Sequence, residues 1–141
     1  MLATVDQLID MYHFFNDRCF QNKLPGDVYI SLHDSFTIPG RYDFEVDEYG
    51  HVTYHNISIS RSFDWTLDQL LDVMLHEMIH EYIYYFGVTR EKNPHGEVFQ
   101  SMMNDLNQKM HRNVTIKQDL TKMKRAPGTS KVGWWFSKTF A

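Results

Sequence analysis

The longest helix-forming pattern in the chain spans residues 66–87 and reads TLDQLLDVMLHEMIHEYIYYFG. Apolar residues recur in it every three to four positions, as they do on a helix with a wide buried face. Thr66 and Gln69 have the spacing of a capping box at the start, and Gly87 is a typical helix stop. The width of the apolar stripe predicts a central helix rather than a peripheral one.

This helix contains the motif His76-Glu77-Met78-Ile79-His80. Histidines four residues apart lie on one helical face and can bind the same tetrahedral metal ion. Glu77 is displaced around the helix, too far to be a good ligand but within reach of a metal-bound water. The motif therefore predicts a zinc site with Glu77 as the catalytic base. The alternative, two ordinary histidines on an amphipathic helix, is disfavoured by the apolar flanks and by another histidine one loop away.

A third ligand must come from outside the motif. The metzincin pattern requires Gly and His three and six residues after the second histidine, where this chain has Ile83 and Phe86. A carboxylate from Glu91 or Glu97 is one possibility. His95 is the stronger candidate, because we expect it to open the next helix after a loop that can fold back. Three histidines and one open position are typical of a catalytic zinc site.

Patterns on either side of this helix predict the remaining elements. Capping and periodicity predict a helix over 4–22, and a second apolar stripe predicts one over 95–111. Alternating residues favour a half-buried strand over 27–33 and a hairpin with its turn at 47–50. The hairpin strands are expected over 41–46 and 51–60, and a short strand over 114–116.

The motif and the segment around His95 together resemble a known family. His95-Gly96-Glu97-Val98-Phe99 follows His80 after fourteen intervening residues. This arrangement resembles the SprT-like metallopeptidases, which include the Spartan proteases and share HExxH followed by His-Gly-x-x-Phe. Upstream, Phe15-Asn16 and Leu24-Pro25 resemble features of the family's first helix, and residues 56–60 resemble the strand before the metal helix. The resemblance covers about residues 5–118.

The resemblance implies an α+β fold, a small zincin-like metalloprotease domain with a short mixed sheet packed on the metal-binding helix and two further helices. It also implies Zn²⁺ bound by His76, His80 and His95, with Glu77 as the catalytic residue. We therefore expect a zinc-dependent endopeptidase that hydrolyses peptide bonds of protein or peptide substrates through a metal-bound water activated by Glu77. Spartan-type members cleave proteins crosslinked to DNA, which extends the expected substrates to DNA-associated proteins. The alternative is a non-catalytic zinc-containing adaptor for a nucleic-acid-associated partner.

Two features depart from the family pattern. Many members carry a cysteine zinc ribbon after the protease core, which the single cysteine, Cys19, cannot build. Glu81 stands where a small residue is common after the second histidine, and we expect it to alter the rim of the site.

Length and composition indicate the class of protein. A chain of 141 residues with 43% hydrophobic residues suits one folded domain. One cysteine and no recognisable signal peptide predict a reducing, cytoplasmic location. No apolar stretch is long enough for a membrane span, so we expect no membrane association, and we expect a monomer.

Charge is unevenly distributed along the chain. Residues 112–141 hold seven basic side chains and one acidic side chain, which gives this segment a net charge of +6. Because the whole chain carries −4, residues 1–111 carry −10. We expect the peptidase domain to occupy residues 1–118 and a basic, aromatic extension to occupy 119–141. This extension could contact DNA, or it could be an ordinary solvated tail. Its Trp134-Trp135-Phe136 run could stack on bases or pack on the core.

Overall fold

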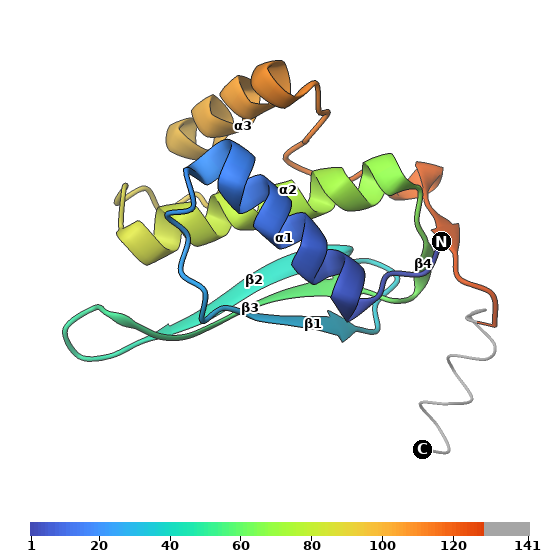
Figure 1. Cartoon of the computed structure of the whole chain (residues 1–141), viewed down its shortest axis with the longest axis horizontal. Helices are drawn as coiled ribbons and strands as arrows, with labels where there is room; N and C mark the ends of the chain where they lie inside the picture. The colour runs from blue at the N-terminus through green and yellow to red at the C-terminus, as the bar shows by residue number, and fades with distance from the viewer. Residues whose placement is uncertain (129–141) are drawn as a thin grey trace.

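The computed structural model describes residues 1–128, so the Trp134-Trp135-Phe136 run lies outside the described residues. Within this range the chain forms three α-helices, one 3-10 helix, a three-stranded sheet and a two-stranded ribbon (Figure 1). In chain order the elements are α1 (Val5–Phe20), β1 (Tyr29–His33), β2 (Gly40–Val46), β3 (Val52–Ser60), β4 (Phe63–Asp64), α2 (Leu67–Phe86), α3 (Glu97–Met110), η1 (Leu120–Lys122) and β5 (Lys124–Arg125). The α+β fold expected from the sequence is confirmed.

The main sheet is mixed and has the strand order β1-β3-β2. β3 pairs in parallel with β1 and antiparallel with β2, to which it is joined by the expected hairpin. A register irregularity between Glu45 and Val46 precedes the turn. β2 is therefore an edge strand, and within residues 1–128 its only strand partner is β3.

The helices lie on one side of this sheet (Figure 1). α2 is central, because it contacts α1, α3, β2 and β3. Its apolar stripe and the inward side chains of β3 form the middle of the core, which α1 and α3 complete. Fully buried residues of this core include Leu8, Phe15, Ile57, Ile59, Leu70, Met74, Met78 and Phe99.

The ends of α1 and α2 follow the local signals in the sequence. Thr4 and Thr66 each form a complete capping box, with Gln7 and Gln69 respectively. Gly87 ends α2 in the left-handed conformation, with φ of 59°, which a residue without Cβ adopts at little cost.

Two local expectations are wrong, and one pair of strands was missed. α3 begins at Glu97 rather than at 95, because Gly96 is the N-cap and His95 precedes the helix. Residues 114–116 form no strand; Asn107 instead holds Val114 through hydrogen bonds to its N–H and carbonyl groups, 2.8 and 2.9 Å long. The β4–β5 pair was not expected from the sequence, since two-residue strands have no detectable periodicity.

Among the described residues no helix is both long enough and apolar enough to cross a membrane.

Candidate metal centre

α2 presents His76 and His80 on the same face, one helical turn apart. Both rings are largely buried. Phe99 of α3 lies beneath them with its ring centroid 4.9 Å from that of His76 and 4.7 Å from that of His80. Phe99 is itself 1% exposed, so the two imidazoles rest on a rigid apolar floor.

His95 reaches the same point from the loop before α3. Its backbone N–H donates to Asn93 Oδ1 at 2.9 Å, and its carbonyl accepts from Gln100 Nε2 at 2.8 Å. Its ring also packs on Phe99, with 4.9 Å between centroids. Backbone contacts on both sides therefore orient this loop histidine, although it does not belong to a helix.

The three imidazoles converge through their Nε2 atoms. His80 Nε2 lies 3.2 Å from His76 Nε2 and 3.1 Å from His95 Nε2, and the third separation is 3.2 Å. Nitrogens at roughly 2.0–2.1 Å from a tetrahedral zinc ion are separated by about 3.3–3.4 Å. Three nitrogens at these separations cannot satisfy one another by hydrogen bonding, whereas one cation satisfies all three. The cluster could therefore hold a metal ion.

Surrounding groups keep the imidazoles of His76 and His80 neutral, which is the form of histidine that can bind a metal. His76 Nδ1 lies 2.8 Å from the carbonyl oxygen of Thr115, so Nδ1 must carry the hydrogen and Nε2 the free lone pair. Burial lowers the pKa of His76 to about 4. Burial, followed by the neighbouring His76 and His95 rings, lowers the pKa of His80 to about 3. At neutral pH these rings are uncharged, as a metal ligand must be.

Glu77 lies beside the cluster and is almost sealed from solvent, with 4% of its surface exposed. Its Oε2 is 4.0 Å from His76 Nε2, too far for a shared ligand set but close enough to act on a molecule between them. Burial, and then the charge of Asp43, raise the pKa of Glu77 to about 8. A cation held by the histidines would lower this pKa, because an opposite charge stabilises the carboxylate.

The absence of a side chain at Gly40 leaves room for Glu77. A Cβ at this first residue of β2 would lie 2.7 Å from Val73 Cγ1, 3.1 Å from Ile59 Cδ1 and 3.1 Å from Glu77 Oε2. β2 and α2 can approach this closely only because residue 40 has no side chain. Gly40 was not predicted as a site residue, because no residue near it in the chain connects it to Glu77.

The sequence of this chain also matches a protein-family model. The sequence model of the SprT-like family matches residues 8–121, most of the chain. The chain belongs to the SprT-like family. No curated protein sequence matches it.

The SprT-like segment His95-Gly96-x-x-Phe99 has a structural reason for its glycine. Gly96 offers no side chain to cap α3, and Glu91 supplies the cap instead. Glu91 Oε1 accepts from the N–H of Glu97 at 3.1 Å, and Oε2 accepts from that of Val98 at 3.4 Å. A Cβ on Gly96 would lie 2.6 Å from Glu91 Oε2. Glu91 and Glu97 were considered as alternative metal ligands. Glu91 instead caps α3, Glu97 is the first residue of that helix, and neither belongs to the histidine cluster.

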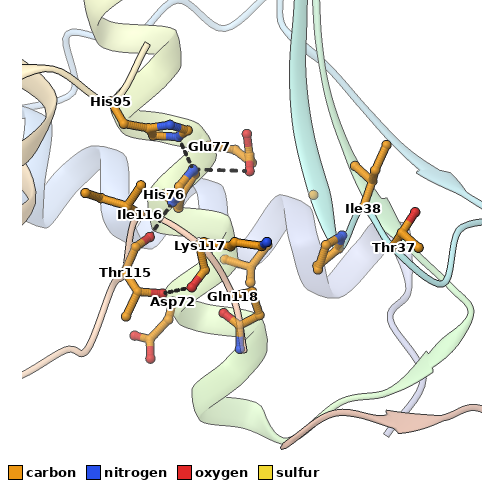
Figure 2. Close-up of a pocket in the computed structure, with 13 residues that line it drawn as sticks. Thr37, Ile38, Asp72, His76, Glu77, His95, Thr115, Ile116, Lys117 and Gln118 are labelled. Atoms are coloured by element: carbon orange, nitrogen blue, oxygen red, sulfur yellow. Dashed lines mark hydrogen bonds and ion pairs between the residues drawn. The ribbon is translucent and has the colours of Figure 1, made fainter. Parts of the chain in front are cut away.

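Two pockets meet at the histidine cluster of this SprT-like chain. The loop-side pocket, of about 210 Å³, lies between residues 37–40 and 115–118 (Figure 2). Figure 2 shows His76, Glu77 and His95 on one wall, with Thr37 and Ile38 opposite. The aromatic pocket, of about 410 Å³, extends the other way along β2 toward Tyr84. Both pockets are lined by the same four residues, Gly40, His76, Glu77 and His95, so the site is open on two sides.

Glu81 was expected on the rim of the site, but it does not lie there. It is fully buried, and its Oε2 lies 3.0 Å from the hydroxyl of Tyr12 on α1. The same oxygen lies 3.6 Å from His55 Nδ1. His55 is also buried, against Asp27 and Tyr42 at 2.8 and 3.0 Å. This polar network joins five parts of the fold, namely α1, the loop before β1, β2, β3 and α2, and it was missed because its members are far apart in the sequence.

Proposed function

We propose that this SprT-like chain is a zinc-dependent endopeptidase. His76, His80 and His95 would hold the ion, and Glu77 would be the catalytic acid and base. The supporting observation is the position of a buried carboxyl 4.0 Å from one corner of a triangle of three imidazole nitrogens. A zinc ion in that position supplies Lewis acidity, which acidifies water and polarises a peptide carbonyl.

Glu77 would move one proton during hydrolysis. Its carboxylate takes the proton from the water that attacks the carbonyl carbon, and it gives that proton to the leaving nitrogen as the C–N bond breaks. Burial raises the pKa of Glu77 and a bound cation would lower it again, so the group can serve both as the carboxylate that takes the proton and as the acid that returns it. The buried position of Glu77 also limits proton exchange with bulk water.

β2 would position the substrate backbone. Its free edge borders both pockets, since Gly40 lines each of them. An extended peptide added to such an edge gains main-chain hydrogen bonds and lies across the histidines. Antiparallel addition is the more stable pairing. We propose that substrates bind to β2 in this way.

Replacement of Glu77 by Gln tests the peptidase proposal. The variant keeps the size of the side chain but cannot take up a proton, so one zinc per chain should remain while cleavage of an unfolded protein is lost. His95→Ala serves as the metal-site control and should lose zinc as well as cleavage. Full cleavage by Glu77→Gln would refute the assigned role. Stoichiometric zinc in a wild-type protein that cleaves nothing would favour the adaptor function.

We also propose that the substrates include DNA-associated proteins, which this chain would reach by binding DNA itself. Lys117, Lys122 and Lys124 are exposed and could contact phosphates. Arg112 is instead paired with Asp68 and Asp72, at 2.9 and 2.8 Å, and these carboxylates largely neutralise its charge. DNA binding through these lysines should weaken strongly with salt. The test is fluorescence anisotropy with labelled DNA at two salt concentrations. Binding that is absent, or that does not change with salt, would contradict the proposal.

A further inference from the structure

Three aromatic side chains form a continuous stack beside the histidine cluster: Tyr42 and Phe44 of β2, and Tyr84 of α2. The ring centroids of Phe44 and Tyr84 are 4.9 Å apart, those of Tyr42 and Phe44 5.7 Å, and those of Tyr42 and Tyr84 6.4 Å. All three pairs are stacked, with interplanar angles of 24°, 22° and 8°. Tyr84 stacks in turn on His80, with 6.0 Å between centroids. We call Tyr42, Phe44 and Tyr84 the aromatic wall.

The aromatic wall is a surface rather than part of the closed core. Phe44 is 37% exposed, and Tyr42 and Tyr84 are half-buried. All three line the aromatic pocket, which at about 410 Å³ has room for a large side chain. Aromatic rings left open to water next to a candidate active site indicate a surface that a ligand covers.

The aromatic wall is anchored through Tyr42 to the buried polar network and through Tyr84 to α2. The hydroxyl of Tyr42 lies 3.0 Å from Nδ1 of the buried His55, which holds the Tyr42 ring in place. Tyr84 lies one helical turn beyond His80 on α2. A preformed wall loses little conformational entropy when an apolar group packs on it.

The two sides of the histidine cluster differ in chemistry. The loop-side pocket mixes the aliphatic Ile38, Val73 and Ile116 with the polar Asp72, Lys117 and Gln118, and it contains no aromatic residue apart from the shared histidines. Stacking with a large side chain of the substrate is therefore expected on the side of Tyr42, Phe44 and Tyr84.

The direction of β2 determines which substrate residues meet the aromatic wall. Gly40 lies against Glu77, and Phe44 follows roughly 13 Å further along the strand. A peptide antiparallel to β2 runs from Phe44 toward Gly40. Its residues before the scissile bond therefore pass Phe44 and Tyr42, and its residues after that bond enter the loop-side pocket.

We propose that the aromatic wall binds a large apolar or aromatic side chain of the substrate, within about four residues on the N-terminal side of the cleaved bond. This specificity rests on the proposed peptidase function and on antiparallel addition to β2. It narrows the substrate class from any unfolded protein to segments that carry Phe, Tyr, Leu or Met at these positions.

The first test measures binding without catalysis. The zinc-loaded Glu77→Gln protein is titrated with N-acetyl-phenylalanine amide or N-acetyl-alanine amide and followed by NMR. We expect the phenylalanine probe to bind on the order of tenfold more tightly and to shift the Tyr42, Phe44 and Tyr84 signals. Adding Phe44→Ala should remove most of this difference. Adding Tyr49→Ala, which truncates an exposed aromatic of the hairpin turn, should leave it unchanged. Equal binding of the two probes, or no binding of either, would overturn the proposal.

The second test maps cleavage sites in a mixture of denatured proteins by mass spectrometry of the new termini. Wild-type protein should cut after segments enriched severalfold in large apolar residues, and Phe44→Ala should reduce the enrichment. Cleavage without this enrichment would refute the proposed specificity. So would an enrichment of large apolar residues only on the C-terminal side of the cleaved bond. Selective binding of the phenylalanine probe by a protein that cleaves nothing would count against the peptidase function and not against the aromatic wall.

Discussion

Replacing Gly40 by Ala should separate the catalytic geometry from the metal site. The new Cβ would lie 2.7 Å from Val73 Cγ1. Comfortable carbon–carbon contacts are about 3.5–4.0 Å, so β2 and α2 would have to separate by roughly 1 Å at this point. Overpacking of this kind costs about 1–3 kcal/mol of the free energy of unfolding. The same Cβ would lie 3.1 Å from Glu77 Oε2 and would displace the carboxylate.

A displacement of about 1 Å at a catalytic group can lower activity by about 100-fold. We therefore expect kcat/KM of Gly40→Ala to fall by about 10- to 100-fold. Zinc binding should persist, because the three atoms nearest to the new Cβ belong to Val73, Glu77 and Ile59 and none belongs to a histidine. The assays are chemical denaturation, zinc analysis and cleavage of an unfolded protein.

Two further variants make the Gly40 prediction refutable. Gly26→Ala is the matched control, because its Cβ would have nothing within 4 Å and its backbone does not adopt a positive φ. Its stability and activity should match those of the wild type. Combining Gly40→Ala with Val73→Ala removes the closest clash and should restore part of the lost activity. A Gly40→Ala protein with wild-type stability and activity would show that the close approach of β2 to Glu77 has no functional role.

Three other predictions follow from the contacts around the site. Glu91→Ala removes the cap of α3 and should lower the free energy of unfolding by about 1 kcal/mol and the zinc affinity about tenfold, the latter measured by chelator competition. Glu48→Ala in the hairpin turn is the control. Equal losses in the two variants would contradict a specific role of Glu91. Burial raises the pKa of Glu77 in the metal-free protein to about 8, so the carboxyl is protonated in the folded state and ionised in the unfolded state between about pH 4.5 and 8. The free energy of unfolding should therefore fall over that range relative to Glu77→Gln, and parallel pH profiles would refute the shift. Tyr12→Phe leaves the buried Glu81 without its hydroxyl partner and should cost about 1–3 kcal/mol in denaturation experiments, whereas an unchanged midpoint would mean that the bond contributes nothing.

Local patterns predicted much of the architecture. Capping boxes at Thr4 and Thr66, the stop at Gly87 and the hairpin turn at 47–50 are all present. Each depends on residues close together in the chain, whose interactions are nearly independent of the remaining fold. The start of α3 was misplaced by two residues because its cap, Glu91, lies five residues before the N-cap and folds back onto the helix.

The sequence alone determined the pairing of His76 with His80, because helical periodicity places residues four apart on one face whatever surrounds them. It also indicated His95 as their partner, through its spacing from the motif. Only the tertiary structure decided how these residues are used. The near-equilateral arrangement of the Nε2 atoms requires the loop before α3 and the Phe99 floor. The burial of Glu77 requires Gly40, 37 positions away, and the aromatic wall requires β2 beside α2. These features depend on the packing of elements distant in sequence, and no local pattern of residues encodes such packing.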